Sequence, residues 1–111
     1  GRLESQIDAA RAREAQALAG YQGAIQNAFR EVRTALAAQR RARESFEAES
    51  GRVAALAATL RLARLRYDNG LASQLDVIDA ERNLLAAEIA RVEALRAQRA
   101  AVADLYKALG G

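Results

Sequence analysis

The chain has 111 residues, a net charge of +3, and no Cys, His or Pro. These absences exclude disulfides, thiol chemistry and the usual zinc sites. Hydroxyl nucleophiles come only from a few Ser and Thr residues with no His to activate them, so we expect neither an enzyme nor a bound cofactor. Ala occurs 29 times and aromatic residues make up only 5%, a composition typical of long, closely packed helices.

Charged residues of both signs alternate along most of the chain, for example at Arg11, Arg13 and Glu14. This pattern is typical of a solvated helix surface with pairs three or four residues apart. Nucleic-acid binding requires a one-sided basic stripe or interleaved aromatic residues, and neither is present. No apolar run approaches the roughly 18 residues of a membrane-spanning helix.

The first long segment, about residues 3–68, carries from Leu18 onward an uninterrupted heptad pattern of mostly apolar residues. Only Gln39 and Glu49 are polar among these positions. The pattern predicts a helix of roughly 100 Å with a continuous coiled-coil seam. The seam consists of Leu18, Tyr21, Ile25, Ala28, Val32, Ala35, Gln39, Ala42, Phe46, Glu49, Val53, Leu56, Leu60, Ala63 and Tyr67.

Residues 69–73 form the tip, the one place where the chain is expected to turn. Gly70 follows Asn69 and tolerates the left-handed conformation that ends many helices. Ser73 is a good N-cap, and Asp76 stands three residues later, where a capping box has Glu or Gln. The sequence therefore predicts a second helix that begins immediately after Ser73.

The return helix, about residues 74–109, has an apolar face wider than one seam, which indicates contacts with two neighbours. Folding about Gly70 and Leu71 places Val53 near Ile89 and leaves residues 1 to about 30 without a partner in the chain. The apolar residues of that free arm must then be covered from outside. The predicted fold is all-α: one domain, residues 1–111, forming a long antiparallel coiled-coil hairpin with unequal arms and a turn near Asn69 to Ser73.

Three parts of the chain resemble TolC-like outer membrane efflux proteins, in the order in which that family has them. The resemblance covers essentially the whole chain and identifies it with the second of two related helical hairpins in that family. The matching segments are the tip Tyr67-x-x-Gly70-x-x-Ser73-x-x-Asp76-Val77-Ile78-Asp79-Ala80, the upper stem Tyr21-x-x-Ala24-Ile25-x-x-Ala28-Phe29-Arg30-Glu31-Val32-x-x-Ala35-Leu36, and the end Leu105-Tyr106-Lys107-Ala108-Leu109-Gly110-Gly111.

The resemblance implies the periplasmic part of a bacterial outer membrane protein. Its parent would be a homotrimeric efflux channel that works with a periplasmic adaptor protein and an inner membrane pump. It would hold to the outer membrane through β-barrel strands that are absent from this chain. The hairpin would line the periplasmic tunnel, and its tip would form the entrance and dock the adaptor.

The resemblance also implies roles for the tip residues. Asp76 and Asp79 match acidic positions at the tunnel entrance, although a helix cap and a favourable helix dipole also account for them. Tyr67 matches a residue that helps to close the entrance, and it also fits as the last seam residue. Ala72 stands where some members have a basic residue of the closing network, which leaves that network incomplete here.

Gly70, Leu71, Ser73 and Leu75 match the loop that meets the adaptor, although turn formation alone accounts for Gly70. Two other functions fit a coiled-coil hairpin: the hairpin of an adaptor protein, or a scaffold unrelated to transport. The Asp76-Val-Ile-Asp79 sequence argues against the adaptor. A scaffold predicts no special role for the tip.

Overall fold

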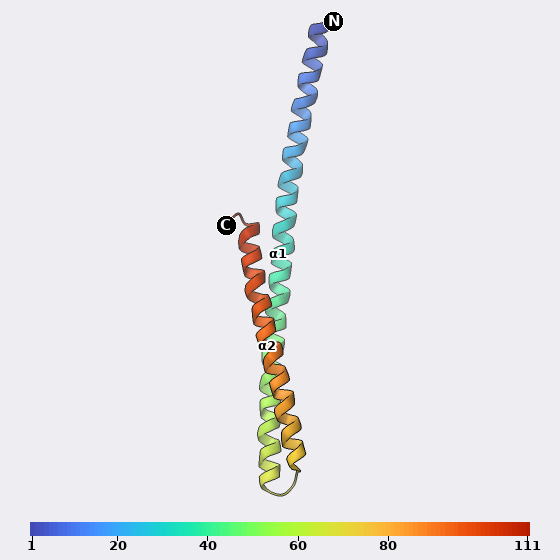
Figure 1. Ribbon diagram of the computed structural model, residues 1–111. Helices are drawn as coiled ribbons and strands as arrows, with labels where there is room; N and C mark the ends of the chain where they lie inside the picture. The colour runs from blue at the N-terminus through green and yellow to red at the C-terminus, as the bar shows by residue number, and fades with distance from the viewer.

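The computed structural model describes residues 1–111 and contains two helices, α1 (Arg2–Asp68) and α2 (Gln74–Ala108). Residues 69–73 connect them, and the helices run antiparallel (Figure 1). The molecule measures 102 × 20 × 13 Å. The predicted hairpin with unequal arms is confirmed, as are the position of its turn and the length of its first helix.

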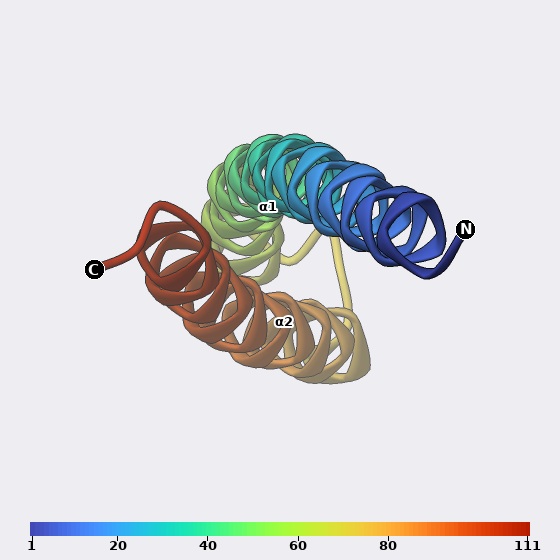
Figure 2. The same ribbon diagram turned by 90° about the horizontal axis from the view of Figure 1, so that it is seen from above.

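The seam predicted on α1 faces α2 wherever α2 is present. Val53 and Leu60 are buried, and the remaining seam positions from Val32 to Ala63 are partly buried. The two helices wrap around each other when viewed along the hairpin (Figure 2). A strict seven-residue repeat produces this supercoil because seven residues fall slightly short of two full helical turns.

The α2 face that packs on α1 has alanines at its centre, with Val77, Leu84 and Leu105 half-buried beside them. Its buried residues recur every seven positions, and Ala87 is completely buried. Small residues let two helices approach closely, and the larger α1 side chains then fill the seam. The four buried residues of α2 are Ala80, Ala87, Ala94 and Ala101.

Several large apolar side chains of α2 are exposed and form a second stripe, whereas Val77, Leu84 and Leu105 are half-buried. Ile89, expected near Val53, is 56% exposed and belongs to this second stripe. The sequence correctly indicated a wide apolar face, because α2 has one stripe that packs on α1 and another left uncovered. The uncovered stripe includes Leu75, Ile78, Leu85, Ile89 and Val92.

The first part of α1 extends alone beyond the end of α2 (Figure 1). Residues 1–22 are all exposed, including Leu18 and Tyr21. A Cβ added at Gly20, Gly23 or Gly51 would meet no atom within 4 Å. No contact inside this chain therefore requires these glycines. Neither helix contains a stretch long and apolar enough to cross a membrane.

Candidate functional site at the hairpin tip

The end of α1 is closed by backbone hydrogen bonds centred on Gly70. Gly70 has φ +73°, its N–H donates to the Tyr67 carbonyl at 3.0 Å, and the Leu71 N–H donates to the Arg66 carbonyl at 2.7 Å. This pair of bonds is the Schellman motif, which satisfies carbonyls that a helix end leaves free. The Asn69 side-chain amide adds a bond to the Leu65 carbonyl at 2.7 Å.

The start of α2 is closed by reciprocal hydrogen bonds between Ser73 and Asp76. The Asp76 N–H donates to Ser73 Oγ at 3.3 Å, and the Ser73 N–H donates to Asp76 Oδ2 at 3.2 Å. The predicted capping box is confirmed, with Asp in place of the usual Glu. Capping hydrogen bonds close the end of α1 and the start of α2, so the five residues between the helices form a turn with a fixed backbone.

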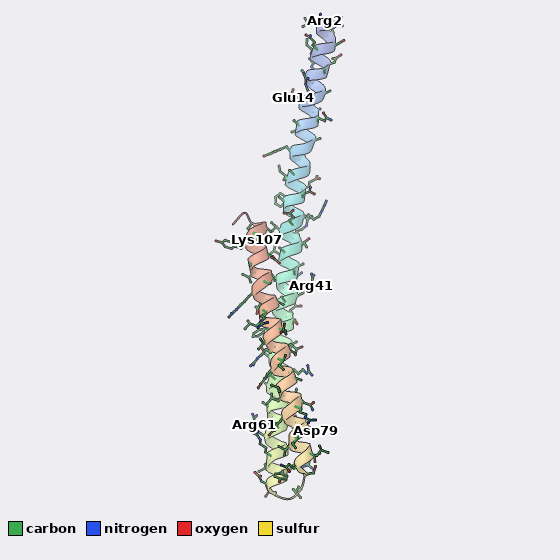
Figure 3. All side chains as sticks on the ribbon, in the orientation of Figure 1. Arg2, Glu14, Arg41, Arg61, Asp79 and Lys107 are labelled. Atoms are coloured by element: carbon green, nitrogen blue, oxygen red, sulfur yellow. The ribbon has the colours of Figure 1, made fainter.

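The two tip aspartates differ in their environments. Asp76 uses Oδ2 in the cap, whereas Asp79 makes no hydrogen bond or ion pair in the chain. Both are exposed, and three-residue spacing places them on neighbouring positions of one helix surface. Figure 3 shows Asp79 in the lower part of α2, close to the turn. The Asp76 carboxylate therefore stabilises the start of α2, whereas the Asp79 carboxylate remains available to groups outside the chain.

Tyr67 and the tip leucines lie at the surface. Tyr67 is in the last turn of α1, is 44% exposed, and its hydroxyl makes no hydrogen bond within the chain. Leu71 and Leu75 are 71% and 62% exposed. Ala72, between them, is half-buried. The turn thus presents two large apolar side chains that no residue of this chain covers.

An ion pair that the sequence analysis did not anticipate joins the two helices above the tip. Arg64 Nη2 lies 3.2 Å from Glu81 Oε1, and both side chains are about half exposed. Each residue directly follows a seam alanine, Ala63 on α1 and Ala80 on α2. Those flanking positions of an antiparallel coiled coil face each other. Comparing flanking charges across the turn would have revealed this pair.

No group of three or more carboxylate, His or Cys side chains could hold a metal ion. The two surface hollows of the molecule lie at the other end of α2, beside Ala108, and not at the tip. What the tip offers is therefore a rigid turn with exposed carboxylates and leucines, a geometry suited to contact with another macromolecule.

Comparison with protein families supplies the decisive observation. All 111 residues match the family described as "Outer membrane efflux protein". The chain belongs to this family. It is the helical, periplasmic part of a bacterial outer membrane efflux protein, as the resemblance at the tip, the stem and the end implied.

Curated members of the family are similar over the whole chain. Identity is 38% to the cation efflux system protein CusC of Escherichia coli K12 and 38% to the outer membrane protein OprJ of Pseudomonas aeruginosa. Identity to the toluene efflux pump outer membrane protein TtgC of Pseudomonas putida is 37%. In each comparison 100% of this chain is covered, but only 24%, 23% and 23% of these relatives. The chain spans about a quarter of their length, and no solved structure matches it significantly.

Proposed function

We propose that this hairpin forms part of the wall of a periplasmic efflux tunnel, with its tip at the entrance. The match to the outer membrane efflux protein family over all 111 residues carries the proposal. Uncovered apolar stripes on both helices support it, because a helix in a closed wall has neighbours on two sides. Other segments of a homotrimeric parent would cover them.

Asp76 and Asp79 are proposed to line the entrance. Three-residue spacing puts both carboxylates on one surface of α2, and neither is neutralised by a basic side chain. Carboxylates repeated around a narrow mouth would concentrate negative potential there and favour cations over anions. Asp79 is the stronger candidate, since Asp76 also accepts the Ser73 N–H.

Tyr67 is proposed to help close the entrance. Its exposed hydroxyl, which has no partner in this chain, is available to a neighbouring helix. Ala72 supplies no charge beside it, so closure at this tip would depend on packing and on the Tyr67 hydroxyl.

Gly70, Leu71, Ser73 and Leu75 are proposed to contact the hairpin tip of a periplasmic adaptor that joins the channel to an inner membrane pump. The capping bonds fix the backbone of this turn, and Leu71 and Leu75 remain exposed on it. A preformed turn with exposed apolar side chains loses little conformational entropy when a second tip packs against it. The family match favours this role over an adaptor hairpin or a transport-unrelated scaffold.

Single-channel conductance of the full-length parent protein in a lipid bilayer tests the proposal. Asp79→Asn is the informative variant, since it removes a carboxylate that makes no bond in the hairpin. We expect reduced cation preference and weaker block by multivalent cations. Glu88→Gln, an equal charge change on α2 away from the tip, is the matched control and should leave selectivity unchanged.

Two further variants separate the roles of the tip. Asp76→Asn alters both a carboxylate and the cap, whereas Ser73→Ala alters the cap alone and should leave cation preference intact. If the Asp79→Asn parent conducts with unaltered selectivity, Asp79 does not contribute to ion selection at the entrance. A folded parent that does not conduct would contradict the channel function itself.

A further inference from the structure

The turn at the tip contains a chemically labile pair of residues. The chain has three asparagines, and only Asn69 is followed by a glycine. An asparagine loses its side-chain amide when the backbone nitrogen of the next residue attacks its Cγ atom. Glycine permits this attack most readily, because it has no Cβ to crowd the approaching nitrogen. We call this pair the Asn69–Gly70 site.

The reaction at the Asn69–Gly70 site needs only water. The Gly70 nitrogen loses its proton and forms a bond to Asn69 Cγ, and the side-chain nitrogen leaves as ammonia. The proton that Gly70 gives up balances the one that the ammonia takes up. Water then opens the resulting succinimide ring at one of its two carbonyls, which leaves aspartate or isoaspartate at position 69.

The backbone of the closed turn opposes the first of these steps. The ψ angle of Asn69 is 9°, so the Gly70 nitrogen lies nearly eclipsed with the nitrogen of Asn69 itself. Ring closure requires the Gly70 nitrogen on the Cβ side instead, and therefore a rotation about the Cα–C bond of Asn69. The Gly70 N–H is also engaged, because it donates to the Tyr67 carbonyl at 3.0 Å.

Two further hydrogen bonds oppose the same rotation. The Asn69 side-chain amide donates to the Leu65 carbonyl at 2.7 Å, which turns its Cγ back along α1. The Leu71 N–H donates to the Arg66 carbonyl at 2.7 Å, and rotation at Asn69 would carry this N–H away. Asn69 is exposed, so water and hydroxide reach it. The turn therefore protects Asn69 through its conformation and not by burial.

We propose that the Asn69–Gly70 site is a deamidation site that the closed turn holds unreactive and that reacts only when the turn opens. Local opening of a short connecting segment needs less free energy than unfolding of the whole hairpin. The rate of deamidation then reports how often the tip opens. This inference does not depend on the proposed channel function.

Both products of the reaction would loosen the turn. An aspartate at position 69 has no N–H to donate to the Leu65 carbonyl. It would also place a second negative charge beside Asp68 at the end of α1, where the helix dipole is unfavourable for anions. An isoaspartate adds a carbon to the backbone, which displaces the N–H groups of Gly70 and Leu71 from their carbonyl partners. A turn that has reacted is therefore harder to close.

Mass spectrometry of the 111-residue chain tests the inference. The chain and a peptide of residues 65–73, too short to hold a helix, are incubated in the same mildly alkaline buffer. Trypsin cleavage after Arg66 and Arg82 releases fragment 67–82, in which Asn69 is the only asparagine. We expect the chain to deamidate about tenfold more slowly than the peptide, or slower still. Ring closure breaks three hydrogen bonds, and each shifts the opening equilibrium by roughly two- to tenfold.

A matched pair of variants tests the role of the turn. Leu71→Pro removes the N–H that bonds to the Arg66 carbonyl and leaves Asn69 and Gly70 in place. It should speed deamidation of the chain by about two- to tenfold relative to a peptide with the same change. Gly111→Pro removes the corresponding 3.0 Å bond to the Tyr106 carbonyl at the end of α2 and should leave the rate unchanged.

Two results would overturn the inference. Equal rates in the chain and the peptide would mean that the closed turn does not protect Asn69. This comparison uses the natural sequence, so it holds even if a variant fails to fold. If circular dichroism shows both variants to be helical and Leu71→Pro reacts no faster than Gly111→Pro, opening of the turn does not control the reaction.

Discussion

Arg64 and Glu81, 17 positions apart in sequence, form the only ion pair between the two helices, with 3.2 Å between Nη2 and Oε1. The pair lies just above the tip and joins residues of α1 and α2 that stand at about the same level. The other salt bridges link residues three positions apart, and they stabilise single helices. Electrostatic attraction between the helices therefore favours the observed alignment of α1 and α2 only through the Arg64–Glu81 pair.

Breaking this pair should destabilise the hairpin only slightly. Both side chains are about half exposed, so Glu81→Gln should lower the free energy of unfolding by about 0.2–1 kcal/mol. The double exchange Arg64→Glu with Glu81→Arg should recover most of that loss. Urea denaturation followed by circular dichroism measures both changes, and the effect should diminish in high salt. A loss that the exchange does not recover would mean that Arg64 acts through packing.

Replacement by Ala should change the stability of the hairpin in opposite directions at two glycines, Gly51 inside α1 and Gly70 just after its end. Gly70→Ala should destabilise the hairpin by about 1–2 kcal/mol, since φ is +73° there. Gly51→Ala should stabilise α1 by about 1 kcal/mol, because the residue is mid-helix and the added Cβ meets nothing. Thermal unfolding of the 111-residue chain measures both effects. Impaired assembly of a stabilised Gly51→Ala parent would indicate that a neighbouring helix passes close to Gly51.

The alanine seam should resist enlargement. Ala87 is completely buried, so Ala87→Leu should force the helices apart and cost about 1–3 kcal/mol. Ala86→Leu adds the same atoms to an exposed position of the same helix and is the control. Denaturation reports the cost, and the distance between spin labels at exposed Arg52 and Arg96 reports the separation. Equal stability of the two variants would show that α2 is not held closely on its alanine face.

Local signals in the sequence were sufficient for the helix boundaries at the tip. Gly70 ends α1 with a positive φ, and Ser73 with Asp76 starts α2 through the expected cap. These features depend on residues within a few positions of one another, so they can be read directly. The roles of Asp79, Tyr67 and the exposed leucines depend on neighbours outside the chain and remain proposals.

The heptad seam of α1 was also determined by the sequence, because only one stripe of that helix combines large apolar residues with a seven-residue repeat. The face of α2 that meets it was decided by the tertiary structure. Periodicity allows two faces there, one of alanines and one with Leu75, Ile78 and Ile89. The large α1 residues Phe46, Val53 and Leu60 fill the space beside small partners, so alanines became the buried centre of the interface. The stripe with Leu75, Ile78 and Ile89 stayed exposed.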